Sequence, residues 1–486
     1  MIKKKIGLAH GVFDVLHSGH LLHLKECKKY CDKLIVSITD DAFVNKGPGR
    51  PIFNSSERVE LIKNFRFVDQ VIINKDYTAI KLINKIKPNY YFKGNDYSDF
   101  SNDLTGNISK EKKTVEKHGG KILILDTKNS SSSSIINQNF NFLSRDLKKK
   151  LKKIDKVKIL NFFKNYNKKK NEKKILILGE PIIDKYTYVD ILGKSQKNQI
   201  ISTSELNKNM IGGGTILVAQ YLSKFFEKVD YLCIDNSFNN QFYKKFLNNK
   251  VNKIIVSDTD SKMTIKNRYV NSYKGERLFQ NNINNNQSLS KNGETKLIFT
   301  LKKIISKYEK IILFDYGHGL INHKLLRFIN NNKNKFYINC QSNSSNFGFN
   351  LATKYNGGHT ICMDELEFRL CVSDRINSIE YLIDKNFKFI SKFKNFIITR
   401  GKNGCFYMIN KKKYNIPIVF ESSRDTTGSG DIFFSNMFFL SISSTLGVEE
   451  KSIVSHIAAG IHDTENMSFK ETDINLISKI FSNITK

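Results

Sequence analysis

Short apolar runs alternate with helix-like segments along the first 140 residues. The runs lie at 6–9, 34–38, 71–73, 90–92 and 122–125. Runs of this length, bounded by polar residues, are typical of buried strands. Strands that alternate with helices form βαβ units, and these build a parallel sheet with helices on both faces. The pattern therefore predicts an α/β domain over residues 1–140, with about five parallel strands.

A basic segment follows this region. From Arg145 to Lys174 there are 14 Lys or Arg and three acidic residues. Apolar residues recur in it at helical spacing, at Leu143, Leu147, Leu151 and Ile154. We expect a basic linker over residues 141–173, made of a helix and a polar tether. A new apolar strand begins at Lys174, and a second α/β rhythm predicts another domain over residues 174–486.

Composition narrows the classes of function. The chain has 486 residues, 40% of them hydrophobic, which is enough for two folded cores and excludes a wholly disordered chain. No apolar run is long enough to span a membrane, no secretory signal is recognisable, and the seven scattered cysteines favour a reduced, cytoplasmic setting. The net charge of +33 leaves a nucleic-acid-binding protein open as a hypothesis, which would show steep salt dependence.

The chemistry of the first half centres on the segment GVFDVLHSGHLLHL, from Gly11 to Leu24. A strand runs into a glycine-containing turn, and a helix is expected to begin near Ser18. His17 and His20 are three residues apart, so both imidazoles can face one side of the helix start. Free N–H groups at a helix N-terminus favour a phosphate, and the two imidazoles could stabilise a nucleotidyl group during transfer.

This segment resembles the HxGH nucleotidyltransferases, in particular the cytidylyltransferase-like type. The resemblance extends to KGPGRPIFNSSER (46–58), FKGNDY (92–97) and SSSSSII (130–136). It implies that His17 and His20 are catalytic and that Lys46, Arg50 and Lys93 bind phosphate groups. It also implies that Ser131, Ser132 and Ser133 cap a helix and bind the nucleotide phosphates.

The second half is distinguished by RDTTGSGDIFFSN, from Arg424 to Asn436. Gly428, Ser429 and Gly430 can form an anion-binding turn before an apolar helix. Asp431 would lie at that helix start, where it could accept a proton from a substrate hydroxyl. The segment resembles the second signature of the ribokinase/PfkB-type carbohydrate kinases.

Further segments extend this second resemblance. It implies a catalytic Asp431, a sugar site with Asp184, Gly213 and Gly214, and a nucleotide site with Thr399, Gly401 and Gly404. Several positions depart from the family pattern. Leu217 stands where the family has a sugar-contacting Asn, Asn339-Cys340-Gln341 replaces Asp-Pro-Lys, and Glu180 replaces Asp. The residues expected at the phosphoryl-transfer site keep the family pattern, whereas several residues expected at the sugar site depart from it.

Together the two resemblances predict the fold: a doubly wound HxGH nucleotidyltransferase domain and a ribokinase-like three-layer α/β/α domain with a small β lid within residues 185–280. They imply a bifunctional enzyme similar to the heptose-7-phosphate kinase/heptose-1-phosphate adenylyltransferases, making a nucleotide-activated sugar for surface polysaccharide or lipopolysaccharide. Those enzymes usually have the kinase first, so we expect a swapped order here. The alternative is a glycerol-phosphate-like cytidylyltransferase with a non-catalytic, kinase-like sensor domain.

The expected ligands follow from the same resemblances. They are ATP in the kinase, ATP or CTP in the nucleotidyltransferase, a sugar or sugar phosphate, and Mg²⁺ held mainly by the nucleotide phosphates, with no metal site formed by the protein itself. We expect no nucleic acid and no membrane span, and both families commonly dimerise, which allows a homodimer. The sequence does not name the sugar.

Overall fold

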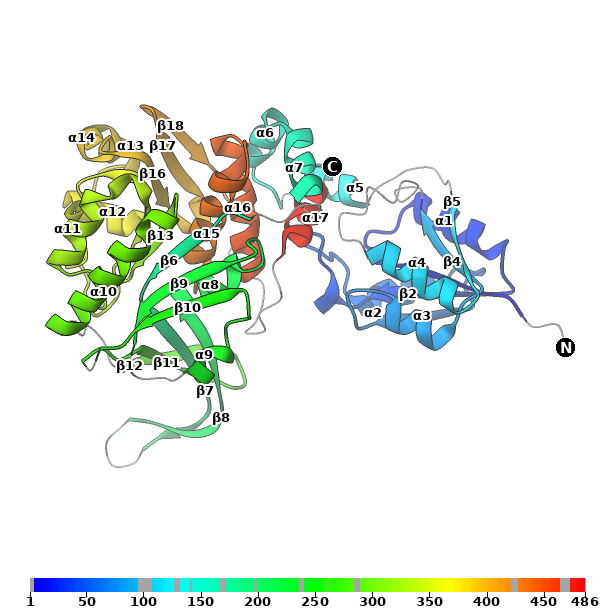
Figure 1. Ribbon diagram of the computed structural model, residues 1–486. Helices are drawn as coiled ribbons and strands as arrows, with labels where there is room; N and C mark the ends of the chain where they lie inside the picture. The colour runs from blue at the N-terminus through cyan, green and yellow to red at the C-terminus, as the bar shows by residue number, and fades with distance from the viewer. Residues whose placement is uncertain are drawn as a thin grey trace. The chain divides into compact units, whose positions relative to one another are not determined.

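The computed structural model describes most of the chain, in ranges separated by short gaps (Figure 1). The described residues are 4–94, 107–125, 132–139, 142–166, 172–195, 198, 200–235, 240–258, 260–283, 289–420, 427–463 and 473–485. They form two compact units. Unit 1 comprises Met1–Asn167, Val419–Glu421 and Asp473–Lys486, and unit 2 comprises Lys168–Ile418 and Ser422–Thr472.

Unit 1 is built on a parallel sheet. In the described residues its order is β3-β2-β1-β4-β5, as expected for a doubly wound fold. The strands are β1 (Ile6–Gly11), β2 (Lys33–Thr39), β3 (Gln70–Asn74), β4 (Tyr90–Gly94) and β5 (Lys121–Leu125). All five apolar runs identified in the sequence are strands, and the central runs in β1, β2 and β4 are buried between helices on the two faces of the sheet.

The helices of unit 1 lie on both faces of this sheet and beyond its edge. They are α1 (Ser18–Lys28), α2 (Ser55–Lys63), α3 (Ile80–Ile86), α4 (Asn107–Lys117), α5 (Ser132–Asn139), α6 (Arg145–Lys153), α7 (Lys156–Tyr166) and α17 (Ile474–Ile484). The basic segment thus contains two helices instead of the single expected one. Helix α6 ends at Ile154, where the backbone becomes extended. At the start of α7, Asp155 Oδ1 accepts a hydrogen bond from Lys158 N.

Helix α17 belongs to unit 1 although it follows unit 2 in the sequence. Its apolar side packs on α7, where the rings of Phe481 and Phe163 lie 6.5 Å apart and both are buried. Lys156 Nζ donates a hydrogen bond to Thr485 O at 3.0 Å. The sequence contained no signal that would separate this helix from the second domain.

Unit 2 has three layers. Its described strands form one sheet of order β10-β9-β6-β13-β14-β15-β16-β17-β18, which is parallel up to β16 and antiparallel beyond it. The strands are β6 (Ile175–Gly179), β9 (Val229–Ile234), β10 (Val251–Val256), β13 (Ile311–Asp315), β14 (Phe336–Cys340), β15 (Gly358–Asp364), β16 (Phe393–Thr399), β17 (Cys405–Ile409) and β18 (Lys412–Ile416).

Helices cover both faces of this sheet (Figure 1). One face bears α10 (Lys291–Ile304), α11 (His323–Asn331), α12 (Glu365–Val372), α13 (Ile379–Lys385) and α14 (Phe387–Ile390), and its core includes Leu297, Leu325 and Phe368. The other bears α8 (Thr215–Leu222), α15 (Ser429–Ser443) and α16 (Val448–Asp463). A short helix, α9 (Asn240–Lys244), lies between β9 and β10 in the sequence. The expected three-layer α/β/α fold is confirmed.

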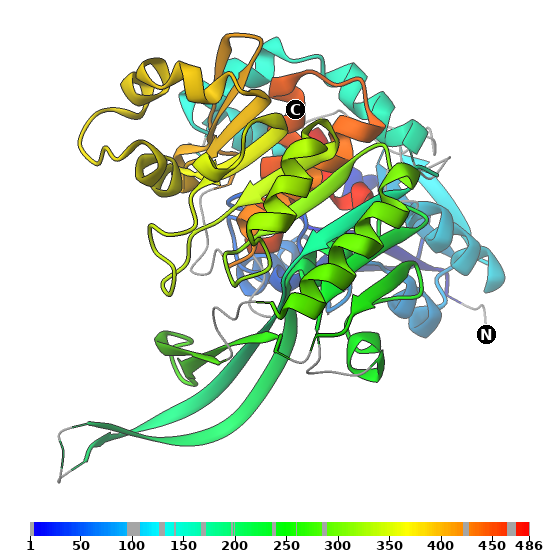
Figure 2. The same cartoon turned by 60° about the vertical axis from the view of Figure 1, so that its left-hand side comes forward.

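A second, smaller sheet extends from unit 2. Its described strands have the order β12-β11-β7-β8, and they are β7 (Pro181–Lys194), β8 (Ile201–Gly214), β11 (Thr264–Asn271) and β12 (Arg277–Ile283). The long hairpin of β7 and β8 projects away from the three layers (Figure 2). This sheet is the β lid expected from the sequence, and its two longest strands begin and end at the predicted sugar site.

Candidate functional site

In unit 1, two histidines and a serine meet at the start of helix α1. His17 is the N-cap of α1, and its ring stacks on that of His20 with centroids 3.9 Å apart. Ser132 Oγ lies 3.3 Å from His17 Nε2 and 3.4 Å from His20 Nε2. The three predicted groups therefore converge from α1 and α5, which begins at Ser132. Ser131 lies outside the described residues.

Capping sets the proton position on His17. The backbone N–H of Gly19 donates to His17 Nδ1 at 3.1 Å, so this nitrogen acts as an acceptor. A neutral imidazole then has its proton on Nε2, the atom that faces Ser132. Burial lowers the pKa of His20 to about 3, and the charge that His17 carries when protonated and the charge of Lys46 act in the same direction. The pKa of His17 is lowered by burial and by Lys46.

It follows that both imidazoles are neutral near pH 7 and offer N–H groups rather than full charges. Positive charge at this place comes instead from Lys46, which acts electrostatically on both rings. Lys46 is partly exposed, in the loop between β2 and α2, as expected for a side chain that reaches a phosphate. A phosphate bound here would meet a hydroxyl, two imidazoles and an ammonium group.

Hydrogen bonds from Arg50 join the loop between β2 and α2 to helix α5. Its Nη1 donates to Ser133 Oγ at 2.7 Å, and its Nη2 donates to Asn137 Oδ1 at 2.6 Å. Asp14, buried after β1, accepts hydrogen bonds from Ile52 N and Phe53 N at 3.0 and 3.2 Å. The turn before α1, the Arg50 loop and the start of α5 are thus joined into one arrangement. Asn137 and Asp14 were not identified from the sequence.

Lys93 is placed differently from the other predicted cations. It is buried, and its Nζ forms an ion pair with Glu111 at 3.1 Å. His10 lies in the same cluster, with its Nδ1 3.0 Å from Ser37 Oγ. Burial lowers the pKa of His10 to about 4, and the charges of Lys93 and Lys479 also lower it. Glu111 was not identified from the sequence, because it lies in a run of exposed-looking Lys and Glu.

In unit 2, Asp431 lies in the first turn of α15. Gly428 is the N-cap in a left-handed conformation (φ 83°), and Ser429 and Gly430 follow it, so backbone N–H groups point out of the helix end. A side-chain carbon added to Gly430 would meet nothing within 4 Å, so space is open at this turn. Arg277 of the lid donates to Thr427 Oγ1 at 2.9 Å, which joins the lid to this loop.

Burial raises the pKa of Asp431 to about 6. Gln341 Nε2 donates to its Oδ1 at 2.7 Å, and this hydrogen bond favours the ionised form. Gln341 occupies the segment where the family has Asp-Pro-Lys, so the departure seen in the sequence has a role in holding Asp431. A buried carboxylate with a pKa near 6 is suited to accept a proton from a sugar hydroxyl.

The predicted sugar residues lie near Asp431. Asp184 on β7 forms a buried ion pair with Arg268 of β11. A side-chain carbon at Gly213 would lie 2.0 Å from Asp184 Oδ2, so only glycine allows this carboxylate its place. Gly214 caps α8 with φ 52°. Lys266 is half-buried, burial lowers its pKa, and the charges of Asp184 and Asp431 act on it in the opposite direction.

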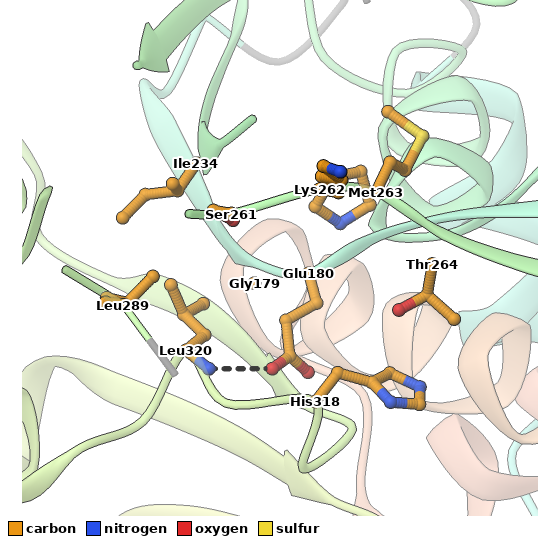
Figure 3. Close-up of a pocket in the computed structure, with 11 residues that line it drawn as sticks. Gly179, Glu180, Ile234, Ser261, Lys262, Met263, Thr264, Leu289, His318 and Leu320 are labelled. Carbon is orange, nitrogen blue, oxygen red and sulfur yellow. Dashed lines mark hydrogen bonds between the residues drawn. The ribbon is translucent and has the colours of Figure 1, made fainter. Parts of the chain in front are cut away.

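A pocket beside this cluster is lined by Glu180, which the sequence showed as a departure from the family pattern, and by residues that the sequence analysis missed, such as His318 (Figure 3). Glu180 accepts hydrogen bonds from Leu320 N at 2.9 Å and Tyr316 N at 3.0 Å. Burial, with the charge of Asp315, raises the pKa of Glu180 to about 7. His318 is 7% exposed, and neither ring nitrogen has a hydrogen-bond partner in the described part of the chain. Where the sequence departs from the family pattern near the expected sugar site, the buried side chains of Glu180 and His318 therefore line a pocket.

The predicted nucleotide residues lie at the carboxyl end of β16. Thr399 is its final residue, and its Oγ1 donates to Met363 O at 3.4 Å. Gly401 and Gly404 follow in the turn to β17 with φ of 50° and 78°. A side-chain carbon at Gly404 would lie 2.0 Å from Ile416 O, whereas one at Gly401 would meet nothing within 4 Å. Gly404 is thus needed by the fold, and Gly401 borders open space.

Comparison with known proteins gives two family matches. Residues 8–139 match the family described as cytidylyltransferase-like. Residues 172–438, more than half of the chain, match the family described as pfkB family carbohydrate kinase. The expected transferase families and both fold classes are thereby confirmed. The matches do not support the swapped domain order that we expected, and we do not retain it.

Curated relatives match one part of the chain. The chain is 39% identical over 124 residues to the bifunctional protein HldE of Nitrobacter winogradskyi, and the match covers 25% of this chain and 24% of the relative. It is 35% identical over 137 residues to the bifunctional protein HldE of Pseudomonas putida, covering 28% of each. The chain thus spans about a quarter of the length of the curated relatives it matches.

A solved structure matches at the level of fold. The crystal structure of phosphofructokinase-2 from Escherichia coli with substrates and products has a TM-score of 0.51 at 14% identity. The match covers 65% of this chain and all of that chain. None of the helices in the described ranges is both long and apolar enough to cross a membrane.

Proposed function

Because the chain belongs to the pfkB family of carbohydrate kinases, we propose that it is a bifunctional enzyme that phosphorylates a sugar and joins a sugar phosphate to a nucleotide. We assign nucleotidyl transfer to residues 1–140 and phosphoryl transfer to the part of residues 174–486 that belongs to unit 2, with residues 141–173 as the connection; α17 at the end of the chain belongs to unit 1. The product would be a nucleotide-activated sugar of the ADP-heptose type, used in surface polysaccharide or lipopolysaccharide. The curated relatives named as bifunctional support this class of function.

The observation that supports the proposal most is the meeting of His17, His20 and Ser132 around one point. In the proposed reaction a phosphate oxygen of the sugar phosphate attacks the α-phosphorus of the triphosphate. The bond to the β-phosphate oxygen breaks, and pyrophosphate leaves. Two neutral imidazole N–H groups and a hydroxyl can donate to the oxygens that gain negative charge, while Lys46 neutralises it.

The kinase reaction uses Asp431 as its base. A sugar hydroxyl oxygen attacks the γ-phosphorus, the bond to the β-phosphate oxygen breaks, ADP leaves, and the hydroxyl proton passes to Asp431. The turn Gly428–Gly430 offers backbone N–H groups to the γ-phosphate. Asp184, Gly213 and Lys266 border the space for the sugar.

Magnesium is expected with both triphosphates. Among the described residues, no group of three or more His, Cys, Asp or Glu is arranged to hold a metal ion. In our proposal the ion arrives bound to the phosphates of the triphosphate. No step above depends on a metal held by protein groups.

One observation favours the alternative, a cytidylyltransferase with a non-catalytic kinase-like half. Asp184, the residue expected to contact the sugar, is already paired with Arg268 and buried. A sugar hydroxyl would have to compete with this ion pair. In that case ADP formation would be absent with every sugar tested, and Asp431→Asn would leave all turnover unchanged.

The test of the proposal is pyrophosphate release by the purified protein. Each nucleoside triphosphate is paired with a panel of sugar 1-phosphates and polyol phosphates, and His17→Asn and Asp431→Asn are measured in parallel. We expect release with one base and one acceptor, lost only in His17→Asn. ADP formation with the matching sugar should be lost only in Asp431→Asn. No release with any pair would refute the nucleotidyltransferase assignment.

A further inference from the structure

Helix α17 contacts the loop that bears the predicted phosphate-binding lysine. A side-chain carbon at Gly47, directly after Lys46, would lie 3.5 Å from Ile480 Cγ2 and 3.5 Å from Ile484 Cγ2. Ile480 and Ile484 are buried, so this side of α17 rests on the loop. Gly47 has φ 108°, where a larger residue is strained. The loop and the helix are thus closely fitted to each other.

A hydrogen bond joins α17 to the helix that starts at Ser132. Asn137 Nδ2 donates to Asn483 O at 2.7 Å. The same side chain accepts the hydrogen bond from Arg50 through its Oδ1. Asn137 therefore connects Arg50 to α17 with its two ends. The hydrogen bond to Asn137 and the packing of Phe481 on Phe163 together hold α17 in place against α5 and α7.

Lys479 lies on the part of α17 that contacts the Lys46 loop and α5. It precedes Ile480, which contacts the loop, and is one turn before Asn483, which is bonded to α5. Its charge acts on half-buried His10 near the end of β1, in the same direction as that of Lys93. The Lys479 side chain is partly exposed to solvent. The Lys479 ammonium group is therefore within electrostatic range of His10 near the carboxyl end of β1.

We propose that Lys479 is a substrate-binding residue of the nucleotidyltransferase site, which α17 completes by bringing a cation to the phosphate groups of the bound substrates. The ligand chemistry is a phosphate anion, supplied either by the triphosphate or by the sugar phosphate. This inference rests on the proposed function of unit 1. It adds to the expected phosphate-binding set a residue more than 300 positions away in the sequence.

The test compares Lys479→Met with the wild type and with Lys479→Arg in the full chain. Lys149→Met is the matched control, because Lys149 is 77% exposed on α6 of the same unit. The KM for the triphosphate and the KM for the sugar phosphate are measured separately by pyrophosphate release. We expect one of the two values to rise about tenfold in Lys479→Met, with kcat nearly unchanged, as for a lost charged hydrogen bond. Which one rises identifies the phosphate concerned.

Arginine should restore most of the affinity, since it keeps the charge, and the control should behave like the wild type. Kinase activity and thermal unfolding report whether the variant remains folded. Unchanged KM values for both substrates in Lys479→Met would overturn the inference while leaving the proposed function intact. If the wild type releases no pyrophosphate, the proposed reaction fails, and titration with inorganic pyrophosphate and phosphate decides the inference. Equal dissociation constants in the wild type and Lys479→Met would then refute it.

Discussion

The buried Asp431 predicts an unusual pH dependence for the kinase reaction. Burial raises the pKa of this carboxyl group from 3.8 to about 6. Only the ionised form can accept the hydroxyl proton, so kcat/KM should follow the ionised fraction. With a pKa of about 6, roughly nine tenths of the groups are ionised at pH 7 and roughly one tenth at pH 5. The kinase rate should therefore fall about tenfold between these values.

An ordinary aspartate would behave differently. With a pKa of 3.8, more than about nine tenths would remain ionised at pH 5, and the rate would scarcely change. The assay is ADP formation with the accepted sugar, measured from pH 4.5 to pH 8.5 at constant ionic strength. Pyrophosphate release in the same buffers shows whether the protein as a whole remains folded.

A variant tests the cause of the shift. Gln341→Leu removes the hydrogen bond that favours the ionised carboxylate, so the acidic limb should move to higher pH. Gln341→Glu is avoided, because it would add a second carboxyl group. A limb near pH 4 in the wild type would refute the reasoning that burial sets this pKa. A limb that does not move in Gln341→Leu would refute the role given to the Gln341 hydrogen bond.

Three further predictions concern other parts of the two sites. Ser132→Ala should lower the rate of pyrophosphate release about tenfold, and Ser132→Thr should keep most of it, since it keeps the hydroxyl; an unaffected Ala variant would exclude the serine from the reaction. Because burial keeps His17 and His20 neutral, pyrophosphate release should not decline from pH 6 to pH 8, as it would if an imidazolium of ordinary pKa were required. Gly213→Ala should raise the KM for the sugar at least several-fold by displacing Asp184, as tested by ADP formation; wild-type values would show that the carboxylate does not contact the sugar.

The strands and the two motifs were accessible from the sequence for a physical reason. A central strand of a parallel sheet is buried on both faces, so most of its residues are apolar and the run is easily recognised, as at 34–38. The HxGH segment lies between a strand end and a helix start about a dozen residues apart at most, and the GSGD segment lies at a helix start. Their geometry is local, and the chemistry could be inferred from residue type and spacing.

The parts that escaped prediction depend on contacts between distant residues. The bond between Asn137 and Asn483 joins positions 346 residues apart, and neither residue lies in a recognisable pattern. Glu111 resembles any exposed glutamate in its Lys-rich run, yet it is buried against Lys93. The role of Gln341 was visible only as a departure from a family pattern. Such pairings become evident only when the fold brings both members together.

The separation of α17 from the rest of unit 1 in the sequence has a consequence for synthesis on the ribosome. Roughly 300 residues are translated between the first 167 residues and α17. At about 5–20 residues per second, the sheet of unit 1 would wait roughly 15–60 seconds for this helix. During that interval the surface around Phe163 and Gly47 has no helix to cover it. Unit 1, whose sheet is translated first, is therefore completed only after unit 2 has been translated. A chaperone that shields this surface would act on the nascent chain.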